Sequence, residues 1–389
     1  MNLIPEYIQR NISPDALEKE LLSLIKKYNA IRNTYLVVYT SSTGKQIPDN
    51  TINQEDYYLL HDLLRDVPHK KVDMYIETRG GSGESAEEIV KLLHDRFEKV
   101  SFVVSGEAKS AGTIIVLSGH EILMTETGSL GPIDAQMRIG RSISSAYDYM
   151  EWVNKKREEA EKQDHLNPFD SVMIAQITPG ELEGVFNALE FAKELVIDWL
   201  VKYKFKDWHK TETRKIAVND EMRKDRAKEI ATVLSNHSKW RSHGRSIKLH
   251  DLVNDIGLKI NRIEDDKSLA EIVYRIQNVC RFIFDMTATY KIFATEENKI
   301  FRTAAKSKAE PPQAVEIKHK CTKCGKITSI YAKLAPNPQI DVEFKKKGCI
   351  AFPKNAKLRC ACGMDADLSD IKKQIESETN NKIIFEGGA

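Results

Sequence analysis

Three short stretches of this sequence combine residue types that can do chemistry. In the first, Gly106-Glu-Ala-Lys-Ser-Ala-Gly-Thr113, an apolar run breaks and a second one with helical spacing begins, with Ser110 at the junction. A serine placed there either caps the helix or acts as a nucleophile. The second stretch, Arg79-Gly-Gly-Ser-Gly83, follows a strand-like run. The third is a group of five cysteines beyond residue 320.

The glycine-rich stretch suits an oxyanion hole better than a phosphate site. No Gly-Lys-Ser/Thr ends it, and the glycine spacing of dinucleotide-binding folds is absent. N–H groups exposed on the Gly80-Gly81 turn can donate to a developing negative oxygen, and the Ala111 amide beside Ser110 would be a second donor. The alternative is structural: glycines also let a strand turn tightly into a helix.

A parallel sheet would bring the two loops together. Strand-like runs alternate with helical ones, the strands at 34–39, 72–77, 99–105 and 120–124 and the helices at 14–31, 54–66, 84–97 and 113–118. Such alternation predicts βαβ units with the site at the carboxyl ends of the strands. Gly81 and Ser110 each follow one of these strands, so we expect both at the same edge of the sheet.

The remaining chain predicts an insertion, further helices and a separate module. Residues 142–184 are charged and weakly periodic, which indicates an insertion or lid. Helical patterns follow at 186–203, 219–234 and 268–293, with a polar, turn-like segment at 235–244. Residues 306–313 have the composition of a linker. We therefore expect a large domain over residues 1–300, a linker over 301–316 and a small module over 317–389.

Composition excludes several protein classes. The chain has 389 residues, 41% of them hydrophobic and 30% charged, with a formal net charge of only +2. This balance fits a globular protein with a core and does not point to nucleic acid as a partner of the whole chain. No run of about 18 apolar residues occurs, and the start lacks the layout of a signal peptide. We therefore expect no transmembrane segment and a reducing, cytoplasmic location.

Three motifs in order resemble a known superfamily. The runs IETRGGSGESAEEIV (76–90), VVSGEAKSAGTIIVLSGHEILM (103–124) and TGSLGPIDAQ (127–136) are similar to those of Clp peptidases and signal peptide peptidases, and in particular to the serine dehydrogenase proteinase group. The segment SNHSKWRSHGRSI…LVNDIGL (235–258) resembles the closing segment of that group. The resemblance covers roughly residues 30–260.

The resemblance carries expectations for fold, activity and site. It implies an α/β, crotonase-like fold built as a ββα spiral, usually assembled as homo-oligomers. It implies a serine endopeptidase that hydrolyses protein or peptide substrates. Carried over residue by residue, Ser110 is the nucleophile, and the amides of Gly81 and Ala111 form the oxyanion hole.

The proton acceptor is where this sequence departs from the Clp pattern. Clp peptidases carry a histidine roughly 25 residues beyond the serine, but Gly131-Pro-Ile-Asp-Ala135 holds none. His120 lies at the start of its strand, the end opposite the expected site, and is expected at the surface. The missing histidine argues against a Ser-His-Asp triad.

Signal peptide peptidases use a lysine instead, and this resemblance implies Lys193 as the base. Lys193 interrupts the apolar stripe of the 186–203 helix, where burial would favour its neutral form. The same helical stripe includes Leu189, Val196 and Leu200. The rival lysines lie in a charged segment typical of a solvated helix face, at Lys155, Lys156 and Lys162.

The C-terminal cysteines predict a structural zinc site. Two close pairs about 35 residues apart suit tetrahedral coordination in a zinc-ribbon-like module, by Cys321, Cys324, Cys360 and Cys362. Cys349 could replace one ligand, and His319 is a weaker substitute. Residues 331–333 and 342–347 have the pattern of ribbon strands with basic faces. Such a module commonly binds protein or nucleic acid.

Two other functions fit a fold of this kind. A catalytically inactive scaffold is possible as long as the base is unassigned. Acyl-CoA chemistry of the crotonase type uses oxyanion amides but has no use for a serine hydroxyl at the junction, so Ser110 argues against it. An active-site serine probe separates peptidase from scaffold, and binding of a CoA thioester would favour the acyl-CoA enzyme.

Overall fold

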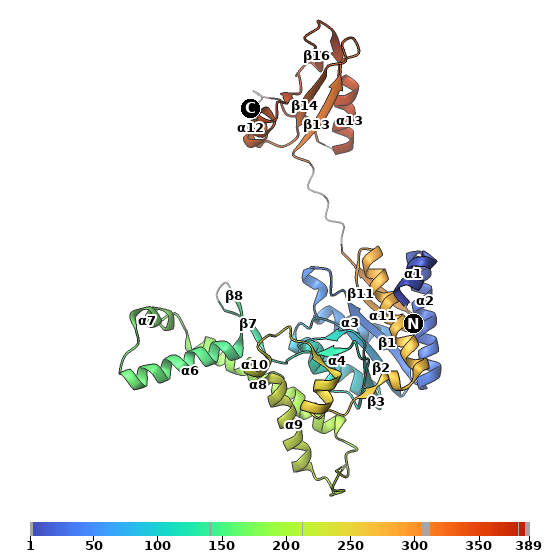
Figure 1. Cartoon of the computed structure of the whole chain (residues 1–389), viewed down its shortest axis with the longest axis vertical. Coiled ribbons are helices and arrows are strands. Elements are labelled where there is room, and N and C mark those ends of the chain that lie inside the picture. The colour runs from blue at the N-terminus through green and yellow to red at the C-terminus, as the bar shows by residue number, and fades with distance from the viewer. Residues whose placement is uncertain (1–2, 140–141, 212, 305–311, 380, 386–389) are drawn as a thin grey trace. The chain divides into compact units, whose positions relative to one another are not determined.

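The computed structural model describes residues 3–139, 142–211, 213–304, 312–379 and 381–385 (Figure 1). The chain divides into two compact units, Met1–Ala304 and Ala305–Ala389, called unit 1 and unit 2 below. Both combine helices and strands, so the expected α/β class is confirmed.

A seven-stranded sheet forms the centre of unit 1. Its strand order is β10-β5-β3-β2-β1-β11-β12, and the first five run parallel to their neighbours whereas β11 and β12 are antiparallel. The strands are β1 (Tyr35–Ser41), β2 (Lys71–Glu77), β3 (Lys99–Val104), β5 (Glu121–Met124), β10 (Asn261–Arg262), β11 (Thr289–Ala294) and β12 (Lys299–Thr303). A small three-stranded sheet has the order β4-β6-β9. Its strands are β4 (Glu107–Ala108), β6 (Ser129–Leu130) and β9 (Ile247–Lys248), and β6 runs parallel to β4 and antiparallel to β9.

Helices cover both faces of this sheet because its strands are apolar on both sides (Figure 1). One face packs against α3 (Gln54–Leu64), α4 (Gly83–Arg96), α5 (Ala111–Leu117), α8 (Pro179–Trp199) and α9 (Asp220–Ser235). The other packs against α1 (Leu3–Arg10), α2 (Pro14–Arg32) and α11 (Lys267–Met286). Adjacent residues of a strand serve opposite faces: Met74 belongs to the first core and Tyr75 to the second.

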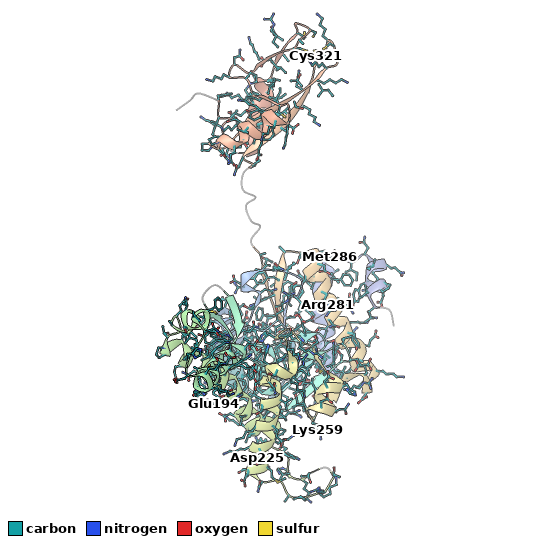
Figure 2. All side chains as sticks on the ribbon, turned by 60° about the vertical axis from the view of Figure 1, so that its left-hand side comes forward. Glu194, Asp225, Lys259, Arg281, Met286 and Cys321 are labelled. Carbon is teal, nitrogen blue, oxygen red and sulfur yellow. The ribbon has the colours of Figure 1, made fainter. Side chains whose placement is uncertain are left out.

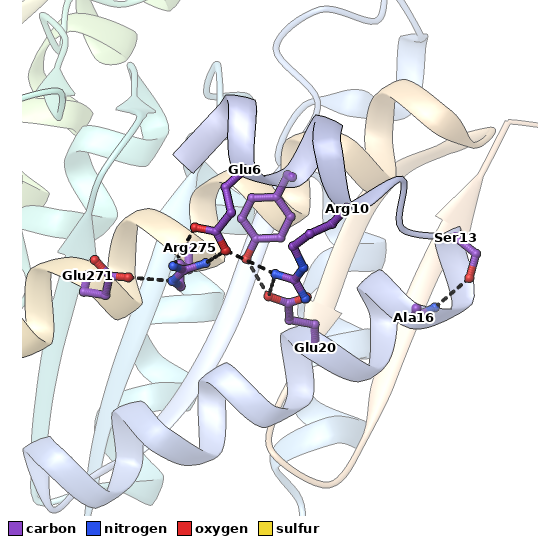
Figure 3. A network of polar contacts seen from close by, with 8 residues as sticks. Glu6, Arg10, Ser13, Ala16, Glu20, Glu271 and Arg275 are labelled. Carbon is purple, nitrogen blue, oxygen red and sulfur yellow. Dashed lines mark hydrogen bonds and ion pairs between the residues drawn. The ribbon is translucent and has the colours of Figure 1, made fainter. Parts of the chain in front are cut away.

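Charged contacts fasten the N-terminal helices to the second face (Figure 3). Arg275 of α11 donates to both carboxylate oxygens of Glu6 in α1, at 2.9 Å each. Arg10 pairs with Glu20 of α2 at 3.1 Å. The bidentate geometry fixes the orientation of α1 as well as attracting it.

One sequence prediction is wrong at strand β11. A helix was expected over 268–293, but α11 ends at Met286 and β11 pairs antiparallel with β1. Residues 287–293, TATYKIF, are rich in β-branched and aromatic types that favour strands. Over so short a run the apolar positions fit the spacing of a helix and of a strand equally well. The periodicity alone therefore does not decide between helix and strand.

Residues 142–184 form a helical arm rather than part of the layers (Figure 1). A hairpin of β7 (Gln136–Ile139) and β8 (Ser142–Ser145) leads into α6 (Ala146–Gln163), α7 (Pro168–Ile174) and the start of α8. Along α6 only Ala146 is buried among the described residues. The arm therefore contributes little to the core, as its charged composition indicates.

Unit 2 is a small α/β module with its own core. Its elements are β13 (Ala314–Lys320), β14 (Ile327–Lys333), α12 (Pro338–Lys346), β15 (Ile350–Ala351), β16 (Lys357–Arg359), β17 (Asp365–Asp367) and α13 (Ser369–Thr379). Residues 331–333 lie in a strand as expected, but the strand predicted for 342–347 is wrong, because 338–346 are helical. Asn337 caps this helix and Pro338 occupies its first turn, which are helix-start signals.

Candidate active site

Ser110 sits in a strained conformation at the start of α5. Its backbone has φ 49° and ψ −119°, a region that residues other than glycine rarely adopt. Its side chain forms no capping hydrogen bond, so the N-cap role is not realised. Strain of this kind persists only where the surrounding structure holds it.

The Gly80-Gly81 loop packs directly against Ser110. A Cβ atom at Gly80 would lie 2.7 Å from the Ser110 Cβ and 3.3 Å from the Ala111 nitrogen. A Cβ at Gly81 would lie 2.3 Å from the carbonyl oxygen of Ile52, and Gly80 has φ 100°. Only glycine fits this close approach, so the two loops meet at one edge of the parallel sheet as the pattern predicted.

Two backbone amides beside Ser110 are free to donate. Ile52 donates to the Gly80 carbonyl at 2.8 Å and accepts from the Ser82 amide at 2.9 Å, which directs the intervening Gly81 N–H away from Ile52. Ala111 is the first residue of α5, where an N–H has no acceptor within the helix. Within the described chain neither amide makes a backbone hydrogen bond. Both suit an oxyanion.

A buried ion pair contacts the Thr51–Ile52 segment, which hydrogen-bonds to the Gly80-Gly81 loop. Lys291 of β11 and Asp56 of α3 both have fully buried side chains and lie 2.7 Å apart. Lys291 also donates to the Thr51 carbonyl at 2.8 Å, next to Ile52. Burial raises the pKa of Asp56 and lowers that of Lys291, and the pairing opposes both shifts.

Removing one partner of this pair should destabilise unit 1 strongly. We expect Lys291→Met to lower the free energy of unfolding by about 3–5 kcal/mol, because it leaves the Asp56 carboxylate buried without a cation. Denaturant titration of the variant measures this change. In the double variant Lys291→Met/Asp56→Leu both charges are gone, so part of the loss should be recovered. A double variant less stable than Lys291→Met would contradict this account.

Lys109, next to the nucleophile candidate, ties the closing segment to this loop. Its Nζ donates to the Leu130 carbonyl at 3.0 Å, the Arg245 carbonyl at 3.1 Å and the Ser246 hydroxyl at 2.9 Å. Burial lowers the pKa of Lys109 to about 8. Three acceptors match the three protons of an ammonium group, so this lysine acts as a structural clamp.

Lys193, the base expected from the sequence, lies on α8. Its side chain is 32% exposed and its Nζ is 3.2 Å from a carboxylate oxygen of Glu190. The same helix reaches the glycine loop through Phe191, whose ring lies 3.2 Å from the Cβ position of Gly83. The Lys193 side chain is thus only partly buried and already has a carboxylate partner, so the full burial expected for Lys193 is not observed.

A carboxylate between two histidines was not anticipated from the sequence. Asp134, fully buried, lies 2.7 Å from Nδ1 of His237 and 2.8 Å from Nδ1 of His243. Burial alone would raise the pKa of Asp134, but hydrogen bonds from His243 and His237 lower it. Asp134 stands in the segment where a Clp peptidase carries its histidine. Two histidines close together in SNHSKWRSHG (235–244), His237 and His243, were the sequence signal that could have indicated this arrangement.

The histidine nearest to Ser110 in sequence lies elsewhere. His120 precedes β5 and its Nδ1 is 3.2 Å from the Val100 nitrogen, at the amino end of the parallel strands. Its ring packs against His94 and Tyr203 and is partly buried. His120 is therefore remote from the strand ends that carry Ser110, as expected, but it is not a freely exposed side chain.

Four cysteines of unit 2 form a cluster that could hold a metal ion (Cys321 is labelled in Figure 2). The Cys321–Cys362 and Cys324–Cys360 sulfur pairs are each 3.7 Å apart, and all four sulfurs lie within 4.8 Å of one another. Tetrahedral zinc with bonds of about 2.3 Å requires sulfur separations of about 3.8 Å. The donor set therefore fits zinc.

The other sulfur and nitrogen candidates do not join this cluster. Cys349 is buried beside Tyr331 and Ile340 in a separate apolar contact, and His319 does not belong to the group of four. Backbone N–H groups of Cys324 and Lys323 lower the pKa of the Cys321 thiol to about 6. This arrangement resembles a knuckle in which amides support a thiolate.

Comparison with known proteins assigns the loop-bearing segment to a family. Residues 50–178 match the model of the ClpP-like SDH-type serine proteinases. The matched segment is about a third of the chain. It contains the glycine loop, Ser110 and Asp134, so the resemblance noted in the sequence is confirmed for the part of unit 1 that builds the site.

Individual similar proteins cover less of the chain. Two uncharacterized proteins of Methanocaldococcus jannaschii are 34% identical over 87 residues (22% of this chain, 30% of the relative) and 32% identical over 66 residues (17% and 23%). The chain thus spans less than a third of the length of either relative.

Solved structures superpose only loosely. A serine-to-alanine variant of the 1510-N membrane-bound stomatin-specific protease is 12% identical, with 57% of this chain and 79% of that chain covered and a TM-score of 0.31. An enoyl-CoA isomerase from M. smegmatis is 13% identical, with 52% and 91% covered and a TM-score of 0.21. Across the described residues, no helix is both long and apolar enough to cross a membrane.

Proposed function

We propose that unit 1 is a serine peptidase that hydrolyses peptide bonds of protein or peptide substrates. Ser110 attacks the carbonyl carbon, and the Gly81 and Ala111 amides stabilise the negative oxygen of the tetrahedral intermediate. The observation that carries this proposal is the strained, uncapped Ser110 packed against the Gly80-Gly81 loop. The family of residues 50–178 supports the same reaction class.

The proton acceptor has two candidates within this proposal. Lys193 is the base that the sequence resemblance implies, and its helix packs near the glycine loop. The second is the Asp134-linked histidine pair.

Covalent labelling tests the proposed function. We expect a fluorophosphonate to modify the intact chain once, with the added mass on the peptide that contains Ser110, because the oxyanion amides favour attack on a tetrahedral phosphorus. Mass spectrometry of a digest locates the adduct, and Ser110→Ala is the control. Labelling that persists in Ser110→Ala would refute Ser110 as the nucleophile. No labelling under any condition would favour the inactive scaffold. Binding of a CoA thioester by the unlabelled chain would favour the acyl-CoA enzyme.

For unit 2 we propose a structural zinc module that recruits or positions partners of the peptidase. Four thiolates close the coordination sphere and leave no position for substrate. Lys318 and Lys320 alternate onto the exposed face of β13, which suits a protein or nucleic-acid partner. We further propose a cytoplasmic location, where thiols remain reduced, and assembly as a homo-oligomer.

A further inference from the structure

A cavity of unit 1 lies away from the serine site. Its volume is about 970 Å³, and its lining comes from the start of β5, the end of α8 and the segment before β10. Ser110 follows the carboxyl end of β3, which runs parallel to β5, so the cavity and Ser110 lie at opposite edges of the sheet. The volume is at the upper end of the range for small-molecule sites. The proposed peptidase chemistry makes no use of this cavity.

Two π-helical turns border the cavity. They are Leu200–Lys204, which continues α8, and Asp251–Asp255. Tyr203 and Lys204 of the first turn and Val253 of the second line the cavity. The part of the chain that the structure describes contains no other π-helical turn. Such turns are rare in proteins and occur frequently at functional sites, so their meeting at one cavity marks it as a candidate ligand site.

Aromatic side chains form part of the lining. The ring centroids of Phe205 and Trp208 are 5.5 Å apart, and both residues are only partly buried. Tyr203, which also lines the cavity, is held by a stacked contact with His94, with 3.4 Å between the ring centroids. Aromatic rings offer a large, rigid apolar surface to a flat ligand. This lining therefore suits a ligand with an aromatic body.

Lys204 contributes a positive charge to the same lining. The residue is partly buried, and within the described residues its ammonium group makes no hydrogen bond or ion pair. Burial lowers the pKa of Lys204 to about 8, the Glu121 carboxylate opposes this shift and the Lys259 charge adds to it. Glu121 is itself paired with Lys99 at 2.6 Å and with Arg32 at 3.2 Å. An anion from solution would supply the counter-charge that Lys204 lacks.

The other charged groups of the lining leave this positive charge uncompensated. Arg226 pairs with a carboxylate of its own helix α9 at 2.6 Å, and Lys210 and Lys259 add further positive charge. Asp207 is exposed to solvent. Burial lowers the pKa of His120, so its ring is neutral at pH 7. The cavity thus combines an excess of positive charge with aromatic surface.

We propose that this cavity binds a small organic anion that has an aromatic body. The carboxylate or phosphate group of the ligand pairs with Lys204, and its ring packs against Phe205 and Trp208. Carboxylate and phosphate share the charged oxygens that an ammonium group binds, and the probes below distinguish them. The site is separate from Ser110, so this inference does not depend on the proposed peptidase function.

Calorimetric titration of the intact chain with four probes tests the proposal. We expect saturable binding of phenyl phosphate or benzoate at one site per chain, and the tighter of the two identifies the head group. Benzyl alcohol lacks the charge and inorganic phosphate lacks the ring, so each should bind at least about tenfold more weakly than the tighter aromatic anion. Absence of saturable binding by both aromatic anions would overturn the proposal.

Matched variants assign the binding to this cavity. Lys204→Met should weaken binding of the aromatic anion by at least about tenfold, because the charged partner is lost. Lys202→Met is the control: Lys202 belongs to the same π-helical turn, but it is exposed and does not line the cavity. Trp208→Ala should weaken binding of phenyl phosphate more than that of inorganic phosphate. Unchanged affinity in Lys204→Met would show that the anion binds elsewhere.

Chemical modification of the unchanged chain gives a readout that needs no variant. At pH 8 about half of the Lys204 side chains are neutral and can be acetylated by N-hydroxysuccinimide acetate. A saturating aromatic anion should slow acetylation of Lys204 by at least about tenfold, because it covers the amine and favours its charged form. Acetylation of Lys202, measured by mass spectrometry of the same digest, should not change. Equal slowing at both lysines, or none at Lys204, would contradict the site even if Lys204→Met fails to fold.

Discussion

Ser110→Gly should inactivate unit 1 and stabilise its fold at the same time. Loss of the hydroxyl removes the nucleophile, so hydrolysis of any substrate found should fall by about 10⁴-fold or more. The stability gain follows from the Ser110 backbone conformation, with φ 49° and ψ −119°. A non-glycine residue pays about 1–3 kcal/mol to adopt such a conformation. Glycine adopts it freely but loses about 0.5–1 kcal/mol through its extra freedom in the unfolded chain. We therefore expect a net gain of about 1 kcal/mol.

Ser110→Ala is the matched control for this effect. It removes the same hydroxyl but keeps a Cβ atom and therefore the strain, so it should be equally inactive without a comparable stability gain. Thermal unfolding of the three chains under one condition measures the difference. If the glycine variant is no more stable than the alanine variant, the strain at Ser110 is not stored in the folded state. That result would weaken the view that the fold holds this serine under strain for catalysis.

The parallel half of the sheet was predictable because each of its elements carries its own signal. Residues 72–77 and 99–105 are apolar runs that end in turn residues, and each observed strand differs from the predicted range by one residue at one end. Strand β11 was not predictable in the same way. There the pairing with β1, a contact of high sequence separation, decides between helix and strand, and no local pattern contains that information.

The same distinction explains which site residues could be found. Ser110 and Gly81 stand directly after strands, so local sequence places them at one edge of the sheet. Asp134 and His243 are 109 residues apart in sequence and meet only because Lys109 and β9 bring the closing segment to the serine loop. Lys193 lies on the predicted helix and pairs with Glu190 three residues away, a local contact, but the 32% exposure of its side chain depends on how the rest of the fold covers that face.

The second large effect concerns the four cysteines of unit 2. We expect about one zinc ion per chain, lost in Cys321→Ser/Cys324→Ser together with the fold of residues 312–385. Metal binding contributes about 10–16 kcal/mol to small zinc modules, which exceeds what a core of this size supplies by itself. The apolar core here consists of few side chains, among them Ile330, Leu358 and Leu368. Without the metal, the two loops bearing the cysteines have little to hold them together.

Metal analysis and limited proteolysis measure the two losses, and Cys349→Ala provides the control. Cys349 is a buried cysteine of the same unit that lies outside the cluster, so its replacement should leave the zinc content unchanged. The double variant should keep the labelling rate of Ser110 on small probes nearly intact, because unit 1 has its own sheet and core. If the double variant stays folded but loses that labelling, the metal serves the active site. The separation proposed between a catalytic unit and a recruiting module would then be wrong.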